Sequence, residues 1–306
     1  MAAAGSTLAA SAEIGIFCRT TEAALRGFQQ ARGLHVTGYC EEETWGALVE
    51  ASWKLGDRLL VLTSPNQRGD DVGELQGSLA LLGFDCDRVD GIFGPHTSRA
   101  LEDFQSNCGL NADGVCGPDT VRALSRVIGQ TGTGPGVAAV RERERLRQTL
   151  TGVASLRVVV GQFGGLSSIT RSVSRELRSA GAHVVAVDEP DAAAQARAAN
   201  QFLAQAYVGF EASRGDATTV YFYRVPTFES VGGNILAACL TDELRSCGLR
   251  VASPCGMRLP VLRETRMPAV LCSVAPVRHA VDAAHDISLA VLRAMNAWTD
   301  LCTLAV

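Results

Sequence analysis

An ungapped internal repeat organises the first half of the chain and constrains its fold more than any other feature. Residues 15–48 and 91–124 align at a constant offset of 76, and fifteen of these 34 positions are identical. Identity at this density without an insertion predicts two copies of one structural unit. The first half of the chain is therefore expected to contain a pair of similar small modules.

The second copy predicts three short helices joined by tight turns. Four apolar residues follow the 3-4-3 spacing of an amphipathic helix: Val72, Leu75, Leu79 and Leu82. Gly83 follows them, and Gly commonly ends a helix. Asp-Gly and Gly-Pro dipeptides within 90–95 and a further Asp-Gly at 113–114 are turn signals. A second helix is expected over 97–107 and a third from Thr120 onward.

This second copy resembles the peptidoglycan-binding domain found in many bacterial cell-wall proteins. The match includes the Asp-Gly-Ile-Phe-Gly-Pro turn at 90–95 and continues through the helices on either side. The resemblance implies that a cell-wall peptide or glycan binds between this turn and the helices. The residues that would carry this binding are Asp90, Gly91, Phe93, Gly94, Thr97 and Phe104. The alternative role of each is structural, because Gly and Asp also set turns and Phe also fills cores.

The first copy departs from this pattern. Ile14 stands where the second copy has Asp90, and Cys18 stands where it has Gly94. At the same offset its first helix would fall before or at Met1, so this copy is expected to be truncated. Packing against its neighbour is then a better expectation for it than ligand binding. The predicted boundaries of the two copies are 1–56 and 66–128.

The composition is that of a globular protein with a slight acidic excess. Lys plus Arg is 28 and Asp plus Glu is 32, so the net charge is −4, which argues against a dedicated nucleic-acid binder. No apolar run approaches the roughly 18 residues of a membrane-spanning helix, and no basic residue precedes Arg19 as a secretory signal would require. These features predict a cytoplasmic protein. The ten cysteines contain no C-x-x-C pair and are expected to be reduced, buried side chains.

A change of pattern follows the repeats. Residues 129–136 are rich in Gly and the charges of 137–149 alternate, so 129–152 is expected to be a linker with a short solvated helix. Beyond it, apolar β-branched runs alternate with helical segments, which predicts an α/β sandwich with helices on both faces over 153–306. The predicted strands are 156–160, 183–187, 206–210, 218–225, 249–252 and 269–274. The predicted helices are 169–180, 191–205, 231–247 and 281–298.

The order of these elements resembles the zinc-dependent N-acetylmuramoyl-L-alanine amidase domain of cell-wall hydrolases. Three segments carry the resemblance: LRVVVGQFGG at 156–165, AQAYVGFEAS at 204–213 and LPVLRETRMPAVLCSV at 259–274. Such amidases hold Zn²⁺ with two His and one Glu, and a further Glu acts as general base. The metal lowers the pKa of its bound water and polarises the amide carbonyl.

The residues that this chemistry requires are missing from the matching positions. The first His position falls on Phe163, the second on Glu211 and the catalytic Glu position on Ser273, while 157–175 contains no Asp or Glu. A catalytic zinc site needs three protein ligands, so no metal site and no catalytic residue are predicted. Glu211, Arg263 and Arg266 are expected to line the remaining cleft, where they could bind an acidic or peptidic group, and the alternative for each is a structural or solvated role.

Together these features predict an α plus α/β protein, with two three-helix repeats, the first truncated, followed by an amidase-like sandwich with a mixed sheet. The chain resembles the CwlM group of actinobacterial proteins, which join two such repeats to an amidase-like domain. The resemblance implies a cytoplasmic, non-catalytic regulator of cell-wall synthesis that binds peptidoglycan or its precursors and needs no cofactor. Its partner would be a precursor-synthesis enzyme, for example the enolpyruvyl transferase of the first committed step. Two alternatives remain: an active zinc amidase that cleaves between N-acetylmuramic acid and L-alanine, and a simple wall-binding module without a protein partner.

Overall fold

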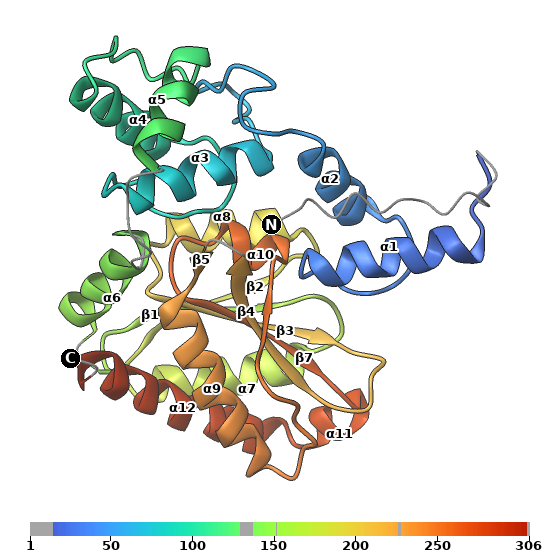
Figure 1. Cartoon of the computed structure of the whole chain (residues 1–306). Coiled ribbons are helices and arrows are strands. Elements are labelled where there is room, and N and C mark those ends of the chain that lie inside the picture. Colours follow the sequence, from blue (N-terminus) through green and yellow to red (C-terminus); the bar gives the residue numbers. More distant parts are fainter. Residues whose placement is uncertain (1–14, 129–136, 151, 226–227, 305–306) are drawn as a thin grey trace.

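Two helical repeats lie against an α/β sandwich, and one further helix connects the two parts (Figure 1). The structure, a computed structural model, describes residues 15–128, 137–150, 152–225 and 228–304. The helices of the repeats and the connecting segment are α1 (Arg19–Ala31), α2 (Glu42–Ala51), α3 (Asp70–Leu81), α4 (Pro95–Asn107), α5 (Pro118–Ile128) and α6 (Val137–Thr149). None of the helices in the described ranges is long and apolar enough to cross a membrane.

The second repeat consists of the three helices α3, α4 and α5, as the sequence predicted. The apolar stripe of α3, which includes Leu75 and Leu79, packs against Phe93, Leu101 and Phe104 in a core that excludes solvent. Helices α1 and α2 of the first repeat correspond to α4 and α5 at the offset of 76. The predicted loss of a preceding helix from the first repeat concerns residues outside those that the structure describes.

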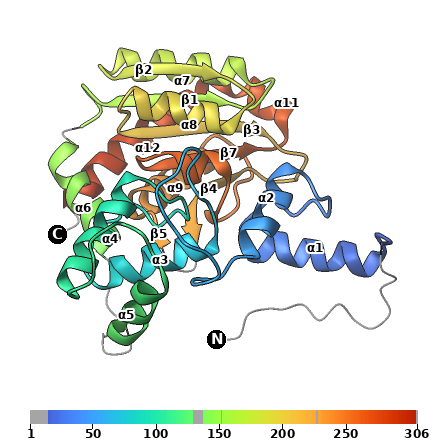
Figure 2. The same ribbon diagram turned by 90° about the horizontal axis from the view of Figure 1, so that it is seen from above.

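The α/β domain is built on one mixed sheet, which confirms the predicted fold class. Its strands are β1 (Arg157–Gln162), β2 (His183–Asp188), β3 (Ala206–Ala212), β4 (Thr219–Val225), β5 (Phe228–Glu229), β6 (Cys255–Met257) and β7 (Ala269–Val274). The strand order is β2-β1-β3-β7-β4-β5, with β6 paired to β4, and Figure 2 shows this order across the sheet. The pairs from β2 to β7 are parallel, whereas β4 runs antiparallel to β7 and to β5.

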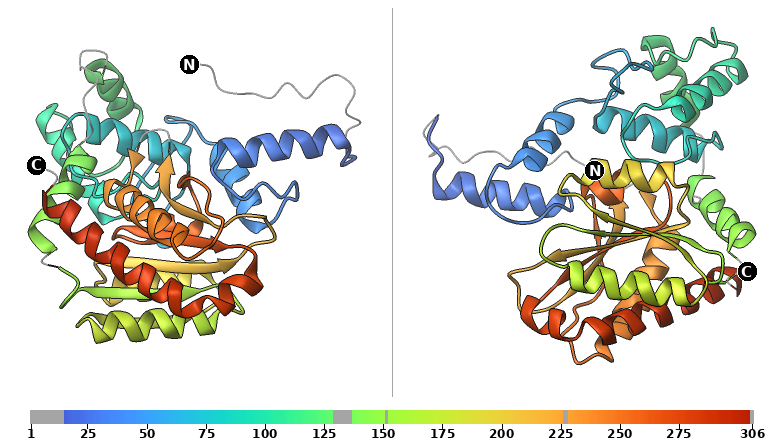
Figure 3. Two further views of the ribbon diagram at one scale, coloured as in Figure 1. Left: turned by 90° about the horizontal axis from the view of Figure 1, so that it is seen from below. Right: turned by 180° about the vertical axis from the view of Figure 1, so that it is seen from behind.

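Helices cover both faces of the sheet. They are α7 (Ser167–Ser179), α8 (Ala192–Gln201), α9 (Val231–Arg245), α10 (Pro260–Glu264), α11 (Val277–Asp282) and α12 (Ala284–Leu304). Figure 3 shows α7 and α12 on the face turned away from the repeats, whereas α8 and α10 lie on the face toward them. The residues Val158, Val159 and Val160 of β1 are fully buried because both faces of this strand are covered.

Three predicted elements differ from the structure. The strand predicted at 249–252 is wrong: only Val251 bridges to Thr218, and strand pairing resumes at β6. Pro254 lies between the two places, and Pro has no backbone N–H to donate to a sheet. Helix α8 is shorter than predicted, because Leu203 adopts a left-handed backbone conformation with φ +53°. The predicted final helix is divided into α11 and α12.

Helix α6 is not the solvated linker helix that its alternating charges predicted. It ties the second repeat to the α/β domain, since Arg141 and Arg145 form ion pairs with Asp85 and Asp87 of that repeat. On its other side, the Glu142 carboxylate accepts hydrogen bonds from the side-chain hydroxyl of Ser230 (2.6 Å) and the backbone N–H of Val231 (2.9 Å), at the start of α9. Leu146 is also buried in the core of the α/β domain.

Candidate functional site

Each helix–turn–helix of the repeats is held by one buried glutamine. In the second repeat, Gln105 Nε2 donates to Asp113 Oδ1 (2.9 Å), to the Val115 carbonyl (3.0 Å) and to Thr120 Oγ1 (3.2 Å). Its Oε1 accepts the N–H of Gly114 at 2.9 Å. The first repeat builds the same network 76 residues earlier, with Gln29, Thr37, Gly38, Tyr39 and Thr44. Sequence comparison found these glutamines as identities, and their role became visible only in three dimensions.

A third glutamine holds the turn that was predicted to bind ligand. Gln76 Nε2 donates to Asp90 Oδ1, to the Ile92 carbonyl and to Thr97 Oγ1, each at 3.0 Å. Its Oε1 accepts the N–H groups of Asp90 (3.0 Å) and Gly91 (2.7 Å). Gly91 has φ +73°, a left-handed conformation that glycine adopts without steric cost. In this structure Asp90, Gly91 and Thr97 therefore have turn-forming roles.

The other predicted ligand residues of the second repeat are also built into its structure. Phe93 and Phe104 lie in the core, and Gly94 is the residue before helix α4. Burial raises the pKa of the Asp90 carboxyl. The Asp90 side chain accepts hydrogen bonds from Gln76 of α3 and from the backbone N–H of Ile92 in its own turn. The ligand-binding role of these residues stays a prediction.

Arg263 does meet the Asp90 turn, although the two lie 173 residues apart. Its Nε donates to the Asp90 carbonyl at 2.6 Å and its Nη2 donates to the Gly91 carbonyl at 3.2 Å. The guanidinium thus contacts the backbone of the turn from the α/β domain. This contact covers one side of the turn, so the turn is an interdomain surface in this arrangement.

A buried ion cluster joins both repeats to the α/β domain at this point. Glu50, at the end of α2, accepts hydrogen bonds from Arg258 Nη2 (2.8 Å) and from Arg263 Nη1 (2.8 and 3.0 Å). Asp70, at the start of α3, forms ion pairs with Arg32 at 2.5 Å and with Arg258 at 3.5 Å. Burial lowers the pKa of Arg258, and the neighbouring charge of Arg263 lowers it further. Sequence analysis did not single out Glu50 or Arg258.

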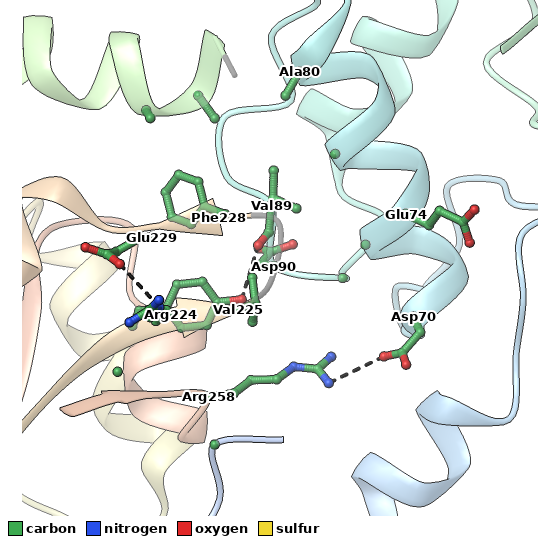
Figure 4. Close-up of a pocket in the computed structure, with 18 of the residues that line it drawn as sticks. Asp70, Glu74, Ala80, Val89, Asp90, Arg224, Val225, Phe228, Glu229 and Arg258 are labelled. Atoms are coloured by element: carbon green, nitrogen blue, oxygen red, sulfur yellow. Dashed lines mark hydrogen bonds and ion pairs between the residues drawn. The ribbon is translucent and has the colours of Figure 1, made fainter. Parts of the chain in front are cut away.

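A cavity of about 1150 Å³ opens beside this cluster, between α3, the end of α1, α6 and the β4–β5 edge. Figure 4 shows charged side chains of both signs around it, with Arg258 directed toward Asp70 and Arg224 paired with Glu229. Glu74 also lines the cavity. The apolar part of the lining includes Ala80, Leu81, Val89, Val225 and Phe228. Its volume is slightly above the roughly 300–1,000 Å³ of typical ligand pockets, and its mixture of charges suits a small molecule with both carboxylate and amino groups.

The positions that correspond to the amidase centre lie together at the carboxyl ends of three neighbouring parallel strands. Phe163 follows β1 and donates its backbone N–H to the Phe210 carbonyl of β3 at 2.9 Å. Glu211 of β3 is in register with Ser273 of β7. Ligand sites of α/β sheets occur at this edge. The structure therefore brings an aromatic ring, a carboxylate and a hydroxyl to this edge of the sheet.

The first repeat covers this strand-end site. His35, in the turn after α1, lies 3.5 Å from Glu211, measured between Nε2 and Oε1, and packs edge-on against Tyr221 with ring centres 5.7 Å apart. The Glu211 carboxylate raises the pKa of His35. His35 was noted in the sequence only as one of five histidines, because nothing in its local pattern predicts a partner 176 residues away.

The residues at the strand ends do not fit a catalytic zinc ion. Phe163 has no donor atom, and the Ser273 hydroxyl cannot serve as a carboxylate base. Within the described ranges, no three His, Cys, Asp or Glu side chains are grouped so that they could hold a metal ion. The donor set here, one carboxylate and one imidazole, falls short of the three protein ligands that a zinc hydrolase uses.

Comparison with known proteins finds similarity to a peptidoglycan-binding family and to several amidases. Residues 2–48 and 68–124 match the family described as "Putative peptidoglycan binding domain". N-acetylmuramoyl-L-alanine amidase CwlM of Mycobacterium tuberculosis is 37% identical over 147 residues, which are 47% of this chain and 36% of that protein. N-acetylmuramoyl-L-alanine amidase CwlH of Bacillus subtilis is 35% identical over 83 residues, which are 25% of this chain and 33% of that protein. The chain thus spans about a third of the length of these relatives.

A solved structure also resembles the chain. The N-acetylmuramoyl-L-alanine amidase from Clostridium difficile 630 has a TM-score of 0.41 and 15% sequence identity, and the match covers 48% of this chain and 97% of that one.

Proposed function

We propose that this chain, which joins peptidoglycan-binding domains to an amidase-like domain, is a non-catalytic peptidoglycan-binding regulator of cell-wall precursor synthesis. The observation that carries the proposal is the set of side chains at the strand-end site, which consists of Phe163, Glu211 and Ser273. Phe163 and Ser273 stand where the amidase family has a zinc ligand and a general base, and Glu211 is engaged by His35 of the first repeat. A protein built in this way keeps the architecture of a wall hydrolase without its chemistry.

The absence of zinc is part of this proposal. An amidase of this class needs a metal-bound water and a carboxylate base to attack an amide bond. Glu211 is the single carboxylate at the three matching positions, and its neighbour His35 comes from another domain. The residues here can hold two domains together, whereas they do not supply both a metal centre and a base.

The cavity beside α3 is the best candidate for the wall-derived ligand. The ion pair of Arg224 and Glu229 places charges of both signs beside a space with apolar walls. The peptide part of peptidoglycan carries carboxylates and amino groups, so it is the part that this lining would bind. The Asp90 turn borders the same cavity, so the predicted turn residues would contribute through its backbone.

The cytoplasmic location and the protein partner rest on the resemblance to the CwlM group. In that setting the ligand would be a peptidoglycan precursor or a recycled fragment. The partner would be an enzyme of precursor synthesis, whose activity the ligand-bound protein would adjust.

Zinc content and hydrolysis test the non-catalytic part of the proposal. Purified, tag-free protein is expected to contain far less than one zinc per chain and to leave muropeptides intact after addition of Zn²⁺. Near one equivalent of zinc, together with release of the peptide from N-acetylmuramic acid, would support the active amidase instead.

Binding to purified sacculi and to soluble muropeptides tests the recognition part. Saturable binding is expected for the wild type, and Arg224→Gln is expected to weaken it by about tenfold through loss of a charge-assisted contact. Arg197→Gln is a matched control, because Arg197 is a surface arginine of α8 outside the cavity. If Arg224→Gln and Arg197→Gln bind equally well, the cavity is not the binding site. If the wild type does not bind, peptidoglycan recognition is refuted.

A further inference from the structure

Each repeat has an equivalent surface groove. Among the described residues, the groove of the first repeat is covered by the α/β domain, whereas that of the second repeat is exposed. In the second repeat a groove of about 410 Å³ lies between the end of α4 and helix α5. Its lining consists of Cys108, Leu110, Asp119, Arg122, Ala123, Arg126 and Val127. At the offset of 76, the corresponding residues of the first repeat are Arg32, Leu34, Glu43, Gly46, Ala47, Glu50 and Ala51. We call these two surfaces the second groove and the first groove.

The first groove is occupied by a segment of the α/β domain, residues 257–263. The backbone N–H of Arg258 donates to the Gly33 carbonyl at 2.7 Å. A Cβ atom on Gly33 would lie 3.0 Å from that same nitrogen, so the two backbones are in close contact. Leu34 is only 4% exposed, and Glu50 holds the guanidinium groups of Arg258 and Arg263. The first groove therefore binds a basic protein segment, the end of β6 with the start of α10, through its backbone and its charges.

The second groove has a matching backbone conformation, and no segment of the residues that the structure describes is seen to occupy it. Gly109 corresponds to Gly33, and their φ angles are +69° and +63°. A Cβ on Gly109 would meet no heavy atom within 4 Å. Cys108 and Arg126 are exposed, and Arg126 forms no ion pair or hydrogen bond with any residue of the described ranges. Helices α4 and α5 lie on the outer side of the molecule, away from the sheet (Figure 1).

The charge at the centre of the groove is reversed between the copies. Glu50 of the first groove corresponds to Arg126 of the second, and Gly46 corresponds to Arg122. Arg122 is paired with Asp119 inside the groove, which leaves the Arg126 guanidinium as the available charge. The first groove binds arginine side chains through Glu50. The second groove has Arg126 at the same position, so it suits a carboxylate instead.

We propose that the second groove is a docking surface for a short acidic segment of a partner protein. The segment binds in the pose that residues 257–263 adopt on the first groove. Its backbone N–H donates to the Gly109 carbonyl, an Asp or Glu side chain pairs with Arg126, and apolar side chains contact Leu110 and Val127. The proposal adds the partner's chemistry to the regulatory role proposed above, and its test does not involve peptidoglycan, so the two can fail separately.

A charge-swap experiment on the full chain tests this docking surface. The probe is a fluorescently labelled peptide of residues 256–264 in which Arg258→Glu and Arg263→Glu are introduced, and the unchanged peptide is its control. Fluorescence anisotropy is expected to show saturable binding of the acidic probe to the wild type. Arg126→Glu is expected to weaken that binding by about tenfold or more and to confer binding of the unchanged, basic peptide.

Arg99→Glu controls for general electrostatic attraction. It makes the same change of net charge on an exposed residue of α4 that does not line the second groove. Thermal melting of both variants would verify that they fold. The proposal is overturned if the acidic probe fails to bind the wild type saturably, or if Arg99→Glu and Arg126→Glu weaken binding equally.

Discussion

Removing the charge of Glu50 should destabilise the attachment of the first repeat far more than removing a surface carboxylate of the same repeat. The Glu50 side chain is 13% exposed and accepts three hydrogen bonds from two guanidinium groups. The variant Glu50→Gln removes the carboxylate between Arg258 and Arg263, and leaves Arg258 with the more distant Asp70, at 3.5 Å, as its ion-pair partner. Loss of one partner from a buried ion pair costs about 3–5 kcal/mol, and we expect a change in unfolding free energy of that size.

The variant Glu22→Gln is the matched control. Glu22 pairs with Arg26 on the surface of α1, where its side chain is 43% exposed, so its loss should cost about 0.5 kcal/mol or less. Urea denaturation would measure both changes, and hydrogen exchange would locate them. Amides of α1 and α2 should lose protection in Glu50→Gln while those of β1 and β3 keep theirs. Equal effects of the two substitutions would refute the conclusion that this cluster holds the repeat in place.

Three further predictions follow from individual contacts. Gln76→Ala removes five hydrogen bonds from the turn, so thermal unfolding should report a loss of about 2–4 kcal/mol, against about 0.5 kcal/mol or less for exposed Gln30→Ala. The pKa of His35 is raised above 6.5 by Glu211, so this pair stabilises the fold fully below pH 6.5 and less as the pH rises through the folded-state value. Melting curves across this range should therefore be less pH-dependent for Glu211→Gln. Glu142→Ala removes the two hydrogen bonds that Ser230 and Val231 donate at the start of α9, and denaturation should show a loss of about 1–2 kcal/mol.

Most of the secondary structure was predictable from the sequence because its signals are local. The apolar spacing from Val72 to Leu79 and the turn dipeptide at Asp90 act over a few residues, and α3, α4 and α5 form where these signals indicate. The predictions that failed involved longer-range effects. Whether residues near Val251 pair as a strand depends on the position of β4, and whether α6 is solvated depends on the domains that lie beside it.

The candidate site was predictable only in part. The sequence predicted strands beside Phe163, Glu211 and Ser273, and β1, β3 and β7 form there. That these positions lack zinc chemistry stays a prediction. The partner of Glu211 could not be located in this way. His35 belongs to a repeat whose own pattern contains no information about the sheet that it contacts.

The sequence by itself determined that the chain has two related repeats and an α/β domain, because repetition, periodicity and turn chemistry are properties of consecutive residues. Only the tertiary structure decided that equivalent surfaces of the two repeats differ in exposure: one is covered by the α/β domain and the other is exposed. Glu50 meets Arg258 and Arg263 across 208 and 213 residues, whereas Arg126 at the equivalent position faces outward. Side chains so far apart in sequence come together only when whole domains pack, and packing depends on the complete surfaces of those domains rather than on any local pattern.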